Sequence, residues 1–165
     1  MAVERKTSQL QLRLTPHDKA AIVRAARREG LDVSSYVLRR VVPSKGDEFR
    51  ALVDKLRSRD DKAYAFAAIG DFLLGVKRNE FTTVLSGVTH VHLGNEDANY
   101  LAAMVEHTAH QKKVRAPDWT RTIRPLEAPM FGSTLSSLRL YLLLSSPLAF
   151  RRRNIFIDST VGDRV

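Results

Sequence analysis

The chain has 165 residues, of which 44% are hydrophobic, and it contains no cysteine. This composition is ordinary for a folded protein, and it excludes a disulfide framework, a thiolate metal site and a cysteine nucleophile. The formal net charge of +9 and the isoelectric point near 10.2 favour a polyanionic partner. Charge alone does not distinguish a nucleic acid from an acidic protein or a membrane surface.

Residues 9–14 alternate strictly, with leucines on one side and Gln9, Gln11 and Arg13 on the other. Such alternation predicts a β-strand. The segment contains no partner strand, so we expect it to pair with the same strand of a second chain. The resulting two-stranded ribbon would fit the major groove of DNA and present its glutamine and arginine side chains to the base edges.

Two helices are predicted after this strand. Thr15-Pro16-His17-Asp18 combines a capping hydroxyl, a first-turn proline and a carboxylate, and Gly30 ends the helix that they start. Asp32-Val33-Ser34-Ser35 starts a second helix, which ends before Pro43. We expect free backbone N–H groups of Ser34 and Ser35 to bind a DNA phosphate. An ordinary strand and two helices within a larger α+β core is the alternative interpretation.

The residues Gln11-Leu12-Arg13-Leu14-Thr15-Pro16 and Gly30-Leu31-Asp32-Val33-Ser34-Ser35-Tyr36-Val37 resemble the antitoxin branch of the ribbon-helix-helix family. In that branch an N-x-R-x-T-P-type sequence precedes the first helix, and G-x-S-x-S-x-F/Y-V opens the second. The sequence departs from the pattern at Gln11, which keeps an amide able to read adenine, and at Asp32, which adds a negative charge near the expected phosphate site. The resemblance implies a dimeric DNA-binding protein of a bacterial toxin–antitoxin system.

A linker is predicted at Ser44-Lys45-Gly46-Asp47, which has turn-forming residues and no periodicity. It divides the chain into a DNA-binding and dimerisation domain, residues 1–45, and an α-rich partner-binding domain, residues 46–165. The expected fold class is therefore mainly α with a short N-terminal β-strand: a ribbon-helix-helix module followed by an α-rich domain. The sequence leaves open whether residues 46–165 fold without a partner.

No catalytic motif is present: we find no P-loop, no G-x-S-x-G elbow and no H-E-x-x-H helix. We therefore expect no enzyme, no catalytic residue and no cofactor. Four histidines at positions 90, 92, 107 and 110 match no known metal signature, so we also expect no metal site. The first residues lack a signal-peptide pattern, and the longest apolar run is too short to cross a bilayer. These features favour a cytoplasmic protein with no membrane partner.

A basic triplet near the C-terminus has two interpretations. It is either a solvated patch or a docking site for an acidic protein or a nucleic acid, because apolar side chains flank it. The expected partner-binding residues are Phe150, Arg151, Arg152, Arg153 and Phe156.

These inferences predict a type II antitoxin and transcriptional autorepressor. It would bind double-stranded operator DNA through the dimeric ribbon and a cognate protein toxin through its C-terminal part, as a homodimer or a higher even-numbered oligomer. The alternatives are a stand-alone ribbon-helix-helix transcriptional regulator with a sensor or oligomerisation domain, and an RNA-binding protein that uses its positive charge. A co-purifying neighbouring gene product would favour the antitoxin, and a preference for single-stranded RNA would favour the RNA-binding protein.

Overall fold

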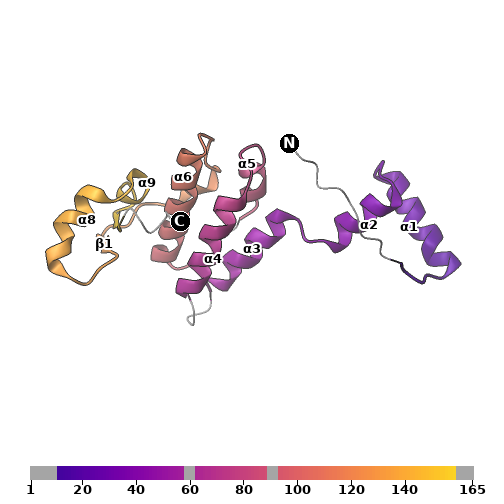
Figure 1. The fold of residues 1–165 in the computed structure, drawn as a ribbon, viewed down its shortest axis with the longest axis horizontal. Coiled ribbons are helices and arrows are strands. Elements are labelled where there is room, and N and C mark those ends of the chain that lie inside the picture. Colours follow the sequence, from indigo (N-terminus) through magenta and orange to yellow (C-terminus); the bar gives the residue numbers. More distant parts are fainter. Residues whose placement is uncertain (1–10, 58–61, 89–92, 159–165) are drawn as a thin grey trace. The chain divides into compact units, whose positions relative to one another are not determined.

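The computed structural model describes residues 11–57, 62–88 and 93–158 (Figure 1). It divides the chain into two compact units: unit 1 is Met1–Pro43 and unit 2 is Ser44–Val165. The boundary expected from the linker composition lies two residues further along the chain, between positions 45 and 46.

Unit 1 contains the helices α1 (Pro16–Arg28) and α2 (Val33–Val41). The hydroxyl of Thr15 caps α1 by accepting the N–H of Asp18 at 3.2 Å. Gly30 ends α1 with a φ of +66°, a backbone conformation that glycine adopts without a steric cost. This turn lets the N–H of Leu31 donate to the carbonyl of Ala26 at 3.0 Å. Both helices therefore lie where the capping residues predict them.

The predicted N-terminal strand is absent from the described part of unit 1, and the expected fold class was wrong in this respect. Residues 11–15 are irregular, and Gln9 and Leu10 lie outside the described residues. A strand needs a neighbour for its backbone N–H and C=O groups, and the other described elements of unit 1 are helices that offer none. Leu12 and Leu14 consequently remain 57% and 48% exposed.

Unit 2 is built around a helix, α4 (Lys62–Gly75), that packs against both α3 (Lys45–Lys55) and α6 (Asn95–Gln111). Because α4 is apolar over most of its circumference, it needs neighbours on more than one side. Phe49, Ile69 and Leu101, one from each of these three helices, are fully buried in the same cluster. The shorter helices are α5 (Phe81–Leu85), α7 (Trp119–Thr122), η1 (Ser136–Leu138), α8 (Arg139–Ser145) and α9 (Leu148–Arg151). Among the described residues, no helix is long and apolar enough to span a membrane.

A small parallel sheet joins the end of unit 2 to the rest of the unit. It pairs β1 (Met130–Phe131) with β2 (Ile155–Phe156), and Met130 lies opposite Ile155. The rings of Phe131 and Phe156 stack with centroids 5.2 Å apart. The buried hydroxyl of Ser146, after α8, accepts the N–H of Ile157 at 2.8 Å. These contacts hold the last described residues of the chain on the second, smaller apolar cluster of the unit.

The N-terminus of α3 has a capping box that makes the stability of unit 2 depend on pH. Hydrogen bonds from Ser44 and Arg50 lower the pKa of Asp47, and a hydrogen bond from Lys45 lowers the pKa of Glu80. A carboxyl whose folded-state pKa is depressed stabilises the fold above its ordinary pKa of about 4, and this contribution is lost as the pH falls through the folded-state value.

We therefore expect Asp47→Asn with Glu80→Gln to lower the melting temperature at pH 7. At pH 2.5 to 3, roughly one unit below that ordinary value, the same pair should have a smaller effect than at pH 7. Calorimetry at the two pH values measures the difference, and an equal loss at both would contradict it.

Candidate nucleic-acid interface

The segment before α1 presents two of the side chains predicted to read bases. Gln11 and Arg13 are both exposed, and Arg13 forms no ion pair with another described residue. Gln9, the third predicted residue, lies outside the described residues. The guanidinium of Arg13 and the amide of Gln11 are therefore accessible to a ligand, and their chemistry suits guanine and adenine edges respectively.

The N-terminus of α2 differs from the expected phosphate site. The carboxylate of Asp32 caps the helix and accepts the N–H of Ser35 at 3.0 Å. The expectation of a free amide at Ser35 was therefore wrong for this structure. A phosphate at this position would have to displace the carboxylate and would be repelled by its charge. Ser34, the other predicted residue, is exposed on the first turn of α2.

The cations among the described residues of unit 1 fall into two groups. Arg39 and Arg40 lie close to Glu29, at 3.6 and 2.6 Å, and the hydrogen bond to Glu29 raises the pKa of Arg40. The other cations are exposed and form no ion pair with a described residue: Arg13, Lys19, Arg24, Arg27 and Arg28. The positive charge available to a phosphate backbone therefore comes from the segment before α1 and from α1 itself. The prediction from sequence did not include the α1 cations, although the run at positions 24, 27 and 28 was a signal for them.

Unit 1 has almost no core of its own. Ala26 is the single buried hydrophobic residue among its described residues. Six of its larger apolar side chains are exposed, namely Leu12, Leu14, Val33, Leu38, Val41 and Val42, and others are only half-buried. Two short helices with this much apolar surface in water cannot offset the entropy of ordering the chain. A single copy of unit 1 therefore leaves an apolar surface that another protein surface has to cover.

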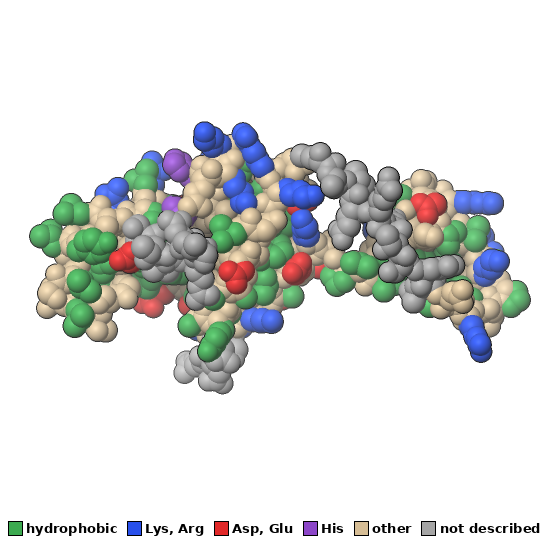
Figure 2. All heavy atoms as spheres, in the orientation of Figure 1, with side chains coloured by type: hydrophobic (Ala, Val, Ile, Leu, Met, Phe, Trp, Pro, Cys, Tyr) green, Lys and Arg blue, Asp and Glu red, His purple; other side chains and the backbone are tan. Residues whose placement is uncertain are grey.

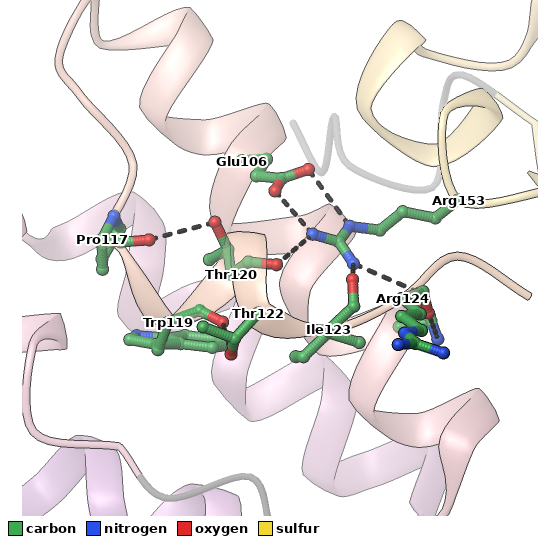
Figure 3. A network of polar contacts seen from close by, with 9 residues as sticks. Glu106, Pro117, Trp119, Thr120, Thr122, Ile123, Arg124 and Arg153 are labelled. Atoms are coloured by element: carbon green, nitrogen blue, oxygen red, sulfur yellow. Dashed lines mark hydrogen bonds and ion pairs between the residues drawn. The ribbon is translucent and has the colours of Figure 1, made fainter.

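The C-terminal basic triplet is divided by the fold. Arg153 is only 5% exposed, and its guanidinium binds both carboxylate oxygens of Glu106, at 2.6 and 3.1 Å (Figure 3). It also donates to the carbonyls of Thr120 and Ile123 and to the side chain of Asn99. All three guanidinium nitrogens are thus used within the chain. Arg153 joins α6, α7 and the end of α9, and it is not available to a partner.

The other predicted docking residues are also unequally placed. Phe150 is buried, and its ring lies edge-on to Tyr100 with centroids 5.5 Å apart. Phe156 is half-buried in the stack with Phe131. Arg151 and Arg152 are exposed, as an interaction surface requires. Burial removes Phe150 and Arg153 from any surface that a partner could reach in this fold.

The histidines form no metal site in the part of the chain that the structure describes. His107 and His110 lie on α6, and a ring nitrogen of His107 is 3.1 Å from the side-chain amide of Gln111. The described residues contain no cluster of three or more side chains able to hold a metal ion. His90 and His92 lie outside these residues.

Comparison with protein families gives a match in the N-terminal part of the chain. Residues 4–63 match the family NikA-like, described as Mobilization protein NikA. The match covers all of α1 and α2 and extends through α3, so it spans just over a third of the chain. Comparisons with curated proteins and with solved structures gave no match.

The family match overturns the predicted antitoxin resemblance, because the matching family is a mobilization protein and no toxin–antitoxin family is found. The residues that carried the resemblance have structural tasks: Thr15 caps α1, Gly30 ends it, and Ser35 lies in the first turn of α2. Such residues are favoured at helix ends in many proteins, whatever the role of the protein in the cell. They could not distinguish one family from another, and the predicted toxin partner has no support.

Proposed function

We propose that this protein binds double-stranded DNA through unit 1, as a homodimer, and serves in the mobilization of DNA. Two features of unit 1 together carry the proposal. Its described cations other than Arg39 and Arg40 are exposed and form no ion pair with a described residue, and a single copy leaves several apolar side chains in water. Unit 1 has nine Lys and Arg against four Asp and Glu, an excess of five positive charges. The family match supports the role, because a protein that mobilizes DNA has to hold it.

The homodimer follows from the surface of unit 1. A second copy supplies an identical apolar surface, so one symmetric contact can cover the exposed leucines and valines of both chains. Each Val or Leu side chain removed from water stabilises the contact by about 1.5–3 kcal/mol. The cations before and along α1 would then be repeated across a two-fold axis, an arrangement suited to duplex DNA with two similar half-sites.

A transcriptional regulator is the second candidate, in which unit 2 senses a ligand or drives oligomerisation. A pocket of about 310 Å³ between α4 and α6, lined by Phe66, Tyr100 and Met104, favours this role because aromatic and apolar linings are typical of small-molecule sites. The two roles differ in where the protein binds. Mapping the bound sites in native cells places a mobilization protein at a transfer locus and a regulator at promoters.

Arg13→Ala tests the proposed interface. We expect the substitution to weaken binding to the preferred duplex by about 1–3 kcal/mol for each half-site, roughly 5- to 150-fold, because each copy loses a guanidinium that can bind a guanine edge with two hydrogen bonds. Binding to unrelated duplexes should weaken less. Fluorescence anisotropy with labelled duplexes selected from random sequence measures both values.

Arg152→Ala is the matched control, because Arg152 is exposed on unit 2 and carries the same charge. It should leave the sequence preference unchanged. If Arg13→Ala and Arg152→Ala behave alike, the segment before α1 does not read the DNA sequence.

A further inference from the structure

Unit 2 has a cluster of cations at one end, where three separate segments of the chain meet. The ammonium of Lys112 donates to the carbonyl of Leu74 at 2.9 Å, which joins the end of α6 to the end of α4. The guanidinium of Arg78 donates to the carbonyl of Lys113 at 3.2 Å. Figure 2 shows Lys and Arg side chains gathered at this end of the unit, near α5 and α6. We call the cluster the basic end and define it by Lys45, Lys77, Arg78, Lys112, Lys113 and Arg115.

Glu80 and Asp118 lie among these cations, and each is already paired. The carboxylate of Glu80 accepts a hydrogen bond from the ammonium of Lys45 and another from the backbone N–H of Lys77. The carboxylate of Asp118 accepts from the guanidinium of Arg115 at 2.7 Å. The side chains of Lys77, Arg78 and Lys113 are exposed and form no ion pair with a described residue.

The charge of the basic end is large compared with that of the whole unit. Residues 44–165 contain 18 Lys and Arg and 14 Asp and Glu, an excess of four positive charges. The six cations of the basic end, less Glu80 and Asp118, also give an excess of four. The remainder of unit 2 is therefore balanced, and the electrostatic attraction of the unit for a polyanion arises at this end.

We propose that the basic end is a second DNA-binding surface, which contacts the phosphate backbone of the duplex that unit 1 holds. The cations come from turns and helix ends, and no aromatic side chain is interleaved with them, so the surface suits phosphates rather than unstacked bases. The contact is independent of sequence and sensitive to salt, and it adds affinity to the sequence-dependent contact of unit 1. The proposal rests on the proposed DNA binding of unit 1.

The test uses the full-length protein and the double variant Lys77→Gln with Lys113→Gln, both at exposed positions. Binding to a duplex of about 40 base pairs, roughly four helical turns, is measured by fluorescence anisotropy from about 50 to 200 mM salt. We expect the affinity to fall to a similar degree for preferred and unrelated sequences. The slope of log K against log salt should decrease by about two for each basic end that contacts the duplex, one for each lost phosphate contact. Arg151→Gln with Arg152→Gln removes the same charge from another exposed part of unit 2 and should change neither quantity.

Two outcomes of this comparison contradict the inference. An unchanged slope in the Lys77 and Lys113 variant means that the basic end does not contact the DNA, and it then serves a different partner such as an acidic protein. An equal change in both double variants means a general charge effect and no defined surface.

Arg13→Ala, measured in the same series, separates this inference from the proposed function. If Arg13→Ala abolishes sequence preference while the lysine variant has no effect, unit 1 binds DNA and the second surface is absent. If Arg13→Ala has no effect and the lysine variant does, the basic end contacts DNA and the sequence reading proposed for unit 1 fails.

Discussion

Arg153→Ala is expected to lower the free energy of unfolding of unit 2 by about 3–5 kcal/mol, because it leaves the carboxylate of Glu106 in a mostly enclosed site without its cation. Arg153 is 6% and Glu106 is 23% exposed at the side chain, so little water can replace the lost contact. The carbonyls of Thr120 and Ile123 also lose their donor. Urea unfolding followed by the fluorescence of Trp119 measures the effect, since the chain has one tryptophan and it lies beside Thr120.

Arg152→Ala is the control for this measurement. Arg152 is the neighbouring residue and is exposed, so its truncation should change the stability by no more than about 0.5 kcal/mol. Arg153→Met combined with Glu106→Leu removes both charges and should cost less than Arg153→Ala alone, because no unpaired charge is left behind. Superimposable unfolding curves for Arg152→Ala and Arg153→Ala would refute the structural role that we assign to Arg153.

Leu14→Glu is expected to raise the dissociation constant of the homodimer by at least about a hundredfold, and to weaken DNA binding with it. Burying one leucine stabilises a contact by about 1.5–3 kcal/mol, and a symmetric dimer loses two. Two carboxylates brought together across the two-fold axis add repulsion. Sedimentation equilibrium of the wild type and the variant measures the dimer, and anisotropy measures the binding of DNA.

The chain offers a matched control in Leu144, which is 73% exposed on α8 of unit 2. Leu144→Glu introduces the same charge at an exposed leucine outside the proposed dimer contact. It should leave both the dimer and DNA binding unchanged. Loss of the dimer with Leu144→Glu and not with Leu14→Glu would move the contact between copies to unit 2.

The helices of unit 1 could be predicted from sequence because their ends are determined locally. A capping hydroxyl at Thr15, a proline after it and a glycine at position 30 act on the backbone within one turn. The predicted N-terminal strand was wrong because local sequence does not determine whether a strand forms. Alternation at residues 9–14 shows which side chains share a face, but a strand also requires a neighbouring backbone, and no described element of unit 1 supplies one.

The role of Arg153 could not be read from the triplet in which it lies. Its partner Glu106 is 47 positions earlier, on α6, and no local pattern joins the two residues. A weaker signal was present, because Arg153 alternates with Ile155 and Ile157, and both isoleucines are buried. An arginine on the buried side of a strand-like run is more often paired inside the fold than exposed on a surface.

Hydrogen–deuterium exchange of the full-length protein, with and without a duplex selected for tight binding, tests the central claim most directly. Because unit 1 holds the DNA in this proposal, bound duplex should slow amide exchange in peptides covering residues 11–42, the segment before α1 together with α1 and α2. Slowed exchange in unit 2 at residues 77–80 and 112–115 would be the additional signature of the basic end. If exchange in residues 11–42 is the same with and without DNA, unit 1 is not the DNA-binding unit and the account is wrong.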